Sequence, residues 1–157
     1  MEKNRKPRGL RNCNPLNIRK TNQLFQGLAD EQDDPDFFRF RTMGWGYRAA
    51  FVILRTYAHK YGIKTIREII GRWAPPEDHN DTGIYIRMVC CLSGLEADQV
   101  LNPYDGKVMI PLVAAMSRVE NGLPDLRVPE LTDERLRRIG TVHLVGCGTA
   151  MHAGMVG

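Results

Sequence analysis

Glu120 is the residue whose type and position in this sequence favour acid chemistry. It lies near the end of an apolar segment with helical spacing, Met109–Gly122, which closes on Asn121-Gly122, residue types that commonly end a helix. A carboxylate at that end meets the negative end of the helix dipole, and partial burial would raise its pKa further. A carboxylic acid that is protonated near neutral pH is the general acid that glycosidic cleavage needs. The alternative is an ordinary exposed glutamate at a frayed helix end.

Glu77 is the second candidate acid, and it ranks below Glu120. It follows Pro76 in a polar loop, where the sequence gives less reason for its carboxylate to be desolvated. The four cysteines and four histidines do not have the spacing of a zinc, haem or redox site. We therefore predict neither a metal site nor a cofactor. These residues are Cys13, Cys90, Cys91, Cys147, His59, His79, His143 and His152.

The segments that must position these groups are mostly helical. Apolar residues at helical spacing, together with helix-ending glycines and prolines, predict the helices. Thr65 and Glu68 have the spacing of a capping box at the start of one of them. A phenylalanine-rich run at 37–40 is predicted to be extended. The expected helices cover residues 43–61, 65–73, 82–92, 96–101 and 109–122, which makes a mainly α domain.

Composition and charge limit the possible functions. The chain has 157 residues and a net charge of +4, and it lacks an apolar run long enough to cross a membrane. Its basic start does not resemble a signal peptide, so we expect cytoplasmic synthesis. Aromatic residues are not interleaved with those cations, which makes nucleic acid an unlikely partner. We divide the chain into a basic flexible arm (1–8), a helical domain (9–126) and a C-terminal tail (127–157).

Four ordered motifs resemble a family of phage and prophage proteins related to lysozyme-like cell-wall hydrolases. They are Asn14–Arg19 (NPLNIR), Gly46–Ala49 (GYRA), Trp73–Glu77 (WAPPE) and Glu120–Gly122 (ENG). The resemblance covers residues 9–122 and implies a lysozyme-like helical domain. In lysozyme-like transglycosylases the asparagine-rich segment follows the glutamate helix, whereas here it comes first. A circularly permuted domain would explain this order, and it requires Glu120 to lie beside the loop around Asn14 and Asn17.

This resemblance implies a peptidoglycan glycosidase of the lysozyme or lytic transglycosylase type. Glu120 would be its only general acid, and Asn14, Asn17, Trp73 and Tyr85 would line a cleft for glycan strands. Trp73 and Tyr85 also lie on apolar helical stripes, where they would belong to the core. The protein would be monomeric and would act on the wall after lysis or as a virion component, with other virion proteins as further partners. The alternative is a non-catalytic virion structural protein or cell-wall-binding protein, because members of the family are often labelled virion proteins.

The C-terminal residues 131–157 carry a second resemblance. They are similar to the start of the sugar-isomerase domain of glutamine:fructose-6-phosphate aminotransferase, in which the Cys147-Gly148-Thr149 turn belongs to the sugar-phosphate site. A single parallel strand cannot bury both of its faces, so this tail alone would not form an isomerase. A truncated sugar-phosphate isomerase fragment is therefore the third alternative.

Overall fold

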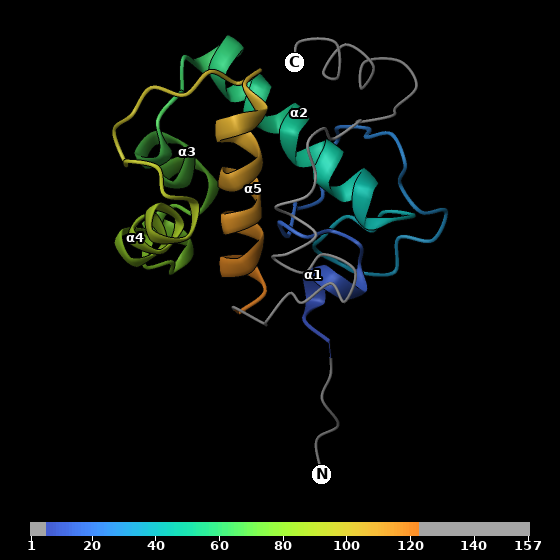
Figure 1. The fold of residues 1–157 in the computed structure, drawn as a ribbon. Helices are drawn as coiled ribbons and strands as arrows, with labels where there is room; N and C mark the ends of the chain where they lie inside the picture. Colours follow the sequence, from blue (N-terminus) through green and yellow to red (C-terminus); the bar gives the residue numbers. More distant parts are fainter. Residues whose placement is uncertain (1–5, 123–157) are drawn as a thin grey trace, which may run out of the picture.

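A computed structural model describes residues 6–122, and this part of the chain is mainly α-helical (Figure 1). Its only β pairings are two isolated bridges, which join Arg19 to Phe37 and Leu28 to Phe40. The prediction of a mainly α fold is confirmed, and the expected extended run at 37–40 takes part in those bridges. The helices are α1 Arg8–Arg11, α2 Met43–Tyr61, α3 Ile66–Trp73, the 3-10 helix η1 Pro76–Asp78, α4 Thr82–Ser93 and α5 Gly106–Glu120.

The helix ends follow from local capping chemistry. Thr65 accepts a hydrogen bond from the Glu68 amide, and the Glu68 carboxylate accepts one from the Thr65 amide, which is the predicted capping box at the start of α3. Gly62 and Gly94 end α2 and α4 in the left-handed conformation that glycine adopts without a steric penalty. Asp105 accepts a hydrogen bond from the Lys107 amide and begins α5.

The predicted helix at 96–101 is wrong. This segment runs as turns, and two of its backbone groups bond to residues at the start of α3. The Arg67 amide donates to the Ala97 carbonyl at 3.0 Å, and the Leu101 amide donates to the Lys64 carbonyl at 2.9 Å. Tertiary partners for the backbone therefore replaced the hydrogen bonds of a short helix.

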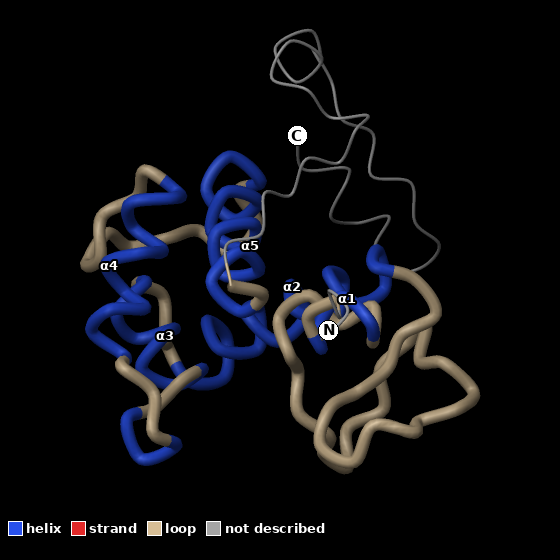
Figure 2. Tube along the Cα trace, turned by 90° about the horizontal axis from the view of Figure 1, so that it is seen from below, coloured by secondary structure: helices blue, strands red, loops and turns tan. Residues whose placement is uncertain are grey.

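Helix α5 lies at the centre of the domain and separates two parts (Figure 1). On one side it packs against α4, which in turn contacts α3, and it also contacts α2. On the other side lie α1 and the loop-rich segment between α1 and α2, as the view from below shows (Figure 2). Six of the fifteen residues of α5 are therefore buried. Its fully or nearly fully buried residues are Met109, Leu112, Val113, Ala115, Met116 and Ser117.

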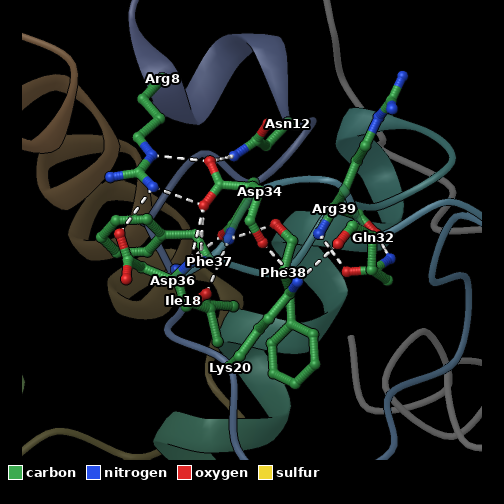
Figure 3. Close-up of polar contacts among 11 residues, drawn as sticks. Arg8, Asn12, Ile18, Lys20, Gln32, Asp34, Asp36, Phe37, Phe38 and Arg39 are labelled. Carbon is green, nitrogen blue, oxygen red and sulfur yellow. Dashed lines mark hydrogen bonds and ion pairs between the residues drawn. The ribbon is translucent and has the colours of Figure 1, made fainter.

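Side-chain hydrogen bonds reinforce the backbone hydrogen bonds that hold the loop-rich segment together (Figure 3). The Asp34 carboxylate accepts hydrogen bonds from the Arg8 guanidinium at 2.6 and 2.7 Å and from the Asn12 amide at 2.7 Å. It also accepts the backbone amide of Phe37 at 2.9 Å. The Lys20 ammonium donates to the carbonyls of Gln32 and Asp34. Arg8 was expected in the flexible arm, but it lies in α1 and ties that helix to this loop.

Asp34→Asn should destabilise the domain by about 2 kcal/mol at neutral pH, the usual cost of losing charged hydrogen bonds at a mostly buried group. The Arg8 guanidinium holds the pKa of Asp34 well below its usual range. The carboxylate therefore adds stability above the unfolded-state pKa of about 3.9, and this stability is lost as the pH falls toward the folded-state value. Thermal unfolding from acid to neutral pH should show a wild-type advantage that shrinks below about pH 4. An advantage that does not change with pH would contradict this account.

Within residues 6–122, none of the helices combines the length and apolar character needed to cross a membrane.

Candidate functional site

Glu120 is the last residue of α5, and polar side chains from two other parts of the chain surround its carboxyl group. Oε1 accepts a hydrogen bond from the Tyr85 hydroxyl of α4 at 2.8 Å. Oε2 accepts one from the Asn17 side-chain amide at 2.9 Å, and the same amide donates to the Glu120 backbone carbonyl at 3.4 Å. Residues 17 and 120 thus meet across the domain. The expected contact between the asparagine-rich loop and the end of this helix is confirmed.

The environment of Glu120 favours its protonated form. Burial raises the pKa of this carboxyl, and hydrogen bonds from Asn17, Tyr85 and Trp73 only partly oppose the rise. None of the ion pairs within residues 6–122 involves Glu120. Burial, followed by the nearby Glu120 charge, also raises the pKa of Tyr85, which therefore stays a phenol that can donate to the carboxylate. The site can thus release a proton from Glu120 and hydrogen-bond the carboxylate that remains.

Asn14 does not line a cleft, and the expectation that it contacts a sugar is wrong. Its side chain is fully buried, and its amide donates to the carbonyls of Ile18 at 2.9 Å and Phe38 at 2.8 Å. Its oxygen accepts the Ile18 backbone amide at 2.8 Å. Asn14 therefore shapes the loop in which Asn17, at a φ of 47°, points toward Glu120. Asparagine is one of the few non-glycine residues that tolerate this conformation.

Asn121 joins the end of α5 to the same loop, a role that the sequence did not indicate. Its side chain is 5% exposed, and its amide donates to the Pro15 carbonyl at 2.8 Å and the Ser117 carbonyl at 2.7 Å. An Asn-Gly pair after a helix indicates only that the helix stops. The side-chain bond to Pro15 spans 106 residues, and local sequence carries no signal of it.

Gly9 allows α1, the loop and α5 to approach closely beside Glu120. A Cβ atom on Gly9 would lie 2.7 Å from the Asn121 side-chain oxygen, 2.8 Å from the Asn17 side-chain oxygen and 2.8 Å from the Asn14 carbonyl. These contacts are too short for a methyl group. Both side-chain oxygens are buried and accept no conventional hydrogen bond from residues 6–122, and the Cα–H group of Gly9 is close to them.

Gly9→Ala should cost about 1–3 kcal/mol, because the methyl group would push three oxygens apart in a packed interior. It should also loosen the contact between Asn17 and Glu120. Urea unfolding of the variant checks the first effect. Gly71→Ala is the matched control, since a Cβ there would meet no atom within 4 Å, and alanine favours its helical position. Equal stability of the two variants would contradict this account of Gly9.

Tyr85 and Trp73 reach Glu120 from the helical side of the domain. Tyr85 is 8% exposed and directs its hydroxyl at the carboxylate, so it belongs to the core and to the site. Trp73 ends α3 and is partly buried; its ring centroid lies 6.4 Å from that of Tyr57, and its side chain hydrogen-bonds Glu120. Glu77 is exposed in η1, and none of the hydrogen bonds described here joins it to the other candidate residues.

Two surface depressions lie away from the Glu120 carboxyl. One of about 550 Å³ is lined by Pro76, His79, Asn80, Asp81, Thr82 and Gly83. The other, of about 530 Å³, lies between α3, α4 and the following turn and includes Arg67, Ile86, Cys90 and Leu95. Neither is lined by Glu120. Among the described residues, His, Cys, Asp and Glu side chains form no group that could hold a metal ion. Cys147, Gly148 and Thr149 lie outside the described residues, so the prediction about them stands as a prediction.

Comparison with known proteins gives one informative similarity. The chain is 43% identical over 122 residues to Protein P5 of Pseudoalteromonas phage PM2. The match covers 76% of this chain and 74% of that phage protein. No protein-family profile matches the chain.

Proposed function

This chain belongs to the family of phage protein P5, and from that premise we propose that it is a phage glycosidase that cleaves the glycan strands of peptidoglycan. Glu120 is its general acid. The single observation that carries the proposal is the sheltered Glu120 carboxyl, which has a raised pKa and no ion pair and is held by Asn17 and Tyr85. A carboxyl kept in this state is suited to protonate a leaving oxygen.

The proposed mechanism assigns one role to each group. Glu120 transfers its proton to the glycosidic oxygen as the bond to the sugar C1 breaks. Asn17 and Tyr85 then donate hydrogen bonds to the new carboxylate and hold it in place. Water then attacks C1 and returns a proton to Glu120, either directly or after the acetamido oxygen of the substrate has first closed a ring on C1. Attack by the C6 hydroxyl of the same sugar in place of water gives the anhydro-sugar of a transglycosylase. Trp73, at the end of α3, is the proposed contact for a sugar ring, through the part of its side chain that is not buried.

A circularly permuted lysozyme-like domain fits this proposal. The asparagine-rich loop precedes the glutamate helix by about a hundred positions in the sequence, yet Asn17 and Glu120 are in contact. Such a contact is what permutation requires, because it moves the ends of the chain while preserving neighbours in space. The protein would be made in the cytoplasm as a monomer and would act on the wall after lysis or as part of the virion.

Digestion of purified peptidoglycan by the full-length protein tests the proposal. Soluble glycan fragments with new chain ends are the expected products. Mass spectrometry then separates hydrolysis, which leaves reducing ends, from transglycosylation, which leaves anhydro-sugars. Absence of new ends with peptidoglycan of several wall types would contradict a glycosidase.

One observation favours a second candidate, a virion or wall-binding protein without catalysis. Both carboxylate oxygens of Glu120 already accept hydrogen bonds inside the protein, as they would if the residue only tied α5 to its neighbours. This candidate predicts that the protein sediments with peptidoglycan but releases no fragments. The two assays on one sample therefore distinguish the candidates.

A further inference from the structure

One surface of the domain carries positive charge and exposed apolar groups together. It is formed by the last turns of α2, by α3 and by the turn segment before α5 (Figure 1). The Leu101 amide bonds the Lys64 carbonyl at 2.9 Å, and His59 hydrogen-bonds the Tyr104 hydroxyl at 2.7 Å, so these segments are held side by side. We refer to it as the α2-end surface, and it consists of Arg55, Lys60, Tyr61, Lys64, Arg72, Val100 and Tyr104.

The cations of the α2-end surface lack carboxylate partners. Arg55, Lys60, Lys64 and Arg72 form no ion pair within residues 6–122, and α2 carries no acidic residue. The acidic residues of the neighbouring elements have other partners. Glu68 accepts the amides of Lys64 and Thr65, Asp98 pairs with Arg67, and Asp105 accepts the Lys107 amide. Hydrogen bonds to neutral amides leave Glu68 and Asp105 negatively charged, so four cations without an ion pair stand against two carboxylates and this surface keeps a net positive charge.

The apolar groups of the same surface are unusually exposed and are held in place. Tyr61 is 46% exposed, Tyr104 is 44% and Val100 is 71%. The Arg72 guanidinium lies 4.1 Å from the centroid of the Tyr61 ring, and the Arg55 guanidinium lies 4.9 Å from that of Tyr104. Each tyrosine is thus flanked by a cation, with the aliphatic Val100 exposed nearby.

We propose that the α2-end surface docks on an anionic lipid bilayer as a peripheral, non-spanning contact. Tyrosines are favoured at the boundary between lipid headgroups and acyl chains, and cations beside them attract acidic headgroups. The Val100 side chain has no polar group that needs a hydrogen bond, so its transfer from water into this boundary is favourable. A nucleic acid fits this surface less well, since a guanidinium already covers one face of each tyrosine ring and bases stack on open faces. This inference does not depend on the role of Glu120.

Sedimentation of the full-length protein with lipid vesicles tests the proposal. Vesicles of phosphatidylcholine with roughly one-third phosphatidylglycerol should bind it, and vesicles of phosphatidylcholine alone should bind it far less. The double variant Lys60→Gln/Arg72→Gln should bind roughly 10- to 30-fold more weakly, since each lost cation weakens binding about fivefold. Val100→Gln should also weaken binding, because it removes an exposed apolar side chain from the contact.

Matched controls keep the test specific to this surface. Arg11→Gln/Arg19→Gln removes two exposed cations elsewhere, and Leu24→Gln removes a side chain that is 90% exposed. Both controls should bind like the wild type, and circular dichroism should show that all variants are folded. Equal weakening of the test and control variants, or no binding to anionic vesicles, would overturn the proposal. Binding of single-stranded DNA without vesicle binding would reassign the surface to nucleic acid.

Discussion

Glu120→Gln should lower peptidoglycan cleavage by at least about 100-fold, the usual contribution of a general acid. Glutamine has the shape of glutamate but cannot give a proton to the leaving oxygen. Its oxygen can accept the Asn17 amide, and its NH₂ group can donate to the Tyr85 hydroxyl, so both contacts of the native side chain have an equivalent. Release of soluble glycan fragments from purified peptidoglycan is the measurement.

The stability of this variant distinguishes lost chemistry from lost structure. Because burial raises the pKa of Glu120, the folded protein holds the proton more tightly than the unfolded chain. Stability therefore falls as the pH rises from the unfolded-state pKa of about 4.3 through the folded-state value. Glutamine removes this loss, so the variant should unfold at the same or a higher temperature than the wild type at neutral pH.

Glu77→Gln is the matched control for activity. It makes the same chemical change at an exposed carboxylate in η1, the second candidate acid. We expect full cleavage activity from this variant. If Glu77→Gln lost activity while Glu120→Gln stayed active, Glu77 would be the general acid and Glu120 would not.

Asn14→Ala should be the most destabilising of these substitutions, by about 3 kcal/mol or more. It removes the side-chain partner of the Ile18 amide and of the Phe38 carbonyl, and it also removes one of two bonds to the Ile18 carbonyl, which keeps the Phe38 amide. Each buried group left without a partner costs about 1–3 kcal/mol. Urea unfolding measures the loss. Cleavage should fall as well, because the loop that carries Asn17 would lose its shape.

Asn80→Ala is the control for this substitution. Asn80 is exposed and donates one hydrogen bond, to the Pro75 carbonyl at 3.2 Å. Its loss should change stability by no more than about 1 kcal/mol. Similar stability losses in the two variants would show that Asn14 does not organise the loop in the way described here.

The helices were predictable because their signals are local. The capping box of Thr65 and Glu68, the stops at Gly62 and Gly94 and the apolar stripe of α5 are all visible within a few residues. The helix predicted at 96–101 does not form because its backbone bonds to Lys64 and Arg67, which lie thirty or more residues away in the sequence. The folded loop around Asp34 depended in the same way on Arg8.

The candidate site was predictable only in part, for the same reason. The sequence indicated Glu120, and the motif order indicated that it meets the asparagine-rich loop, which Asn17 does. Three neighbouring asparagines look equivalent in the sequence, although Asn14 bonds within its own loop and Asn17 bonds to Glu120. The roles of Asn121 and Gly9 depend on contacts across the whole domain.

The contact between Asn17 and Glu120 also has a consequence for biosynthesis. The two residues are 103 positions apart in the sequence. Asn17 is therefore synthesised near the start of the domain and Glu120 near its end. At a translation rate of about 5–20 residues per second, several seconds pass between the synthesis of the asparagine-rich loop and that of Glu120. Nascent chains that stop within α5 hold Asn17, Trp73 and Tyr85 but lack Glu120 and Asn121. Under the proposed function, such an incomplete chain would have no cleavage activity.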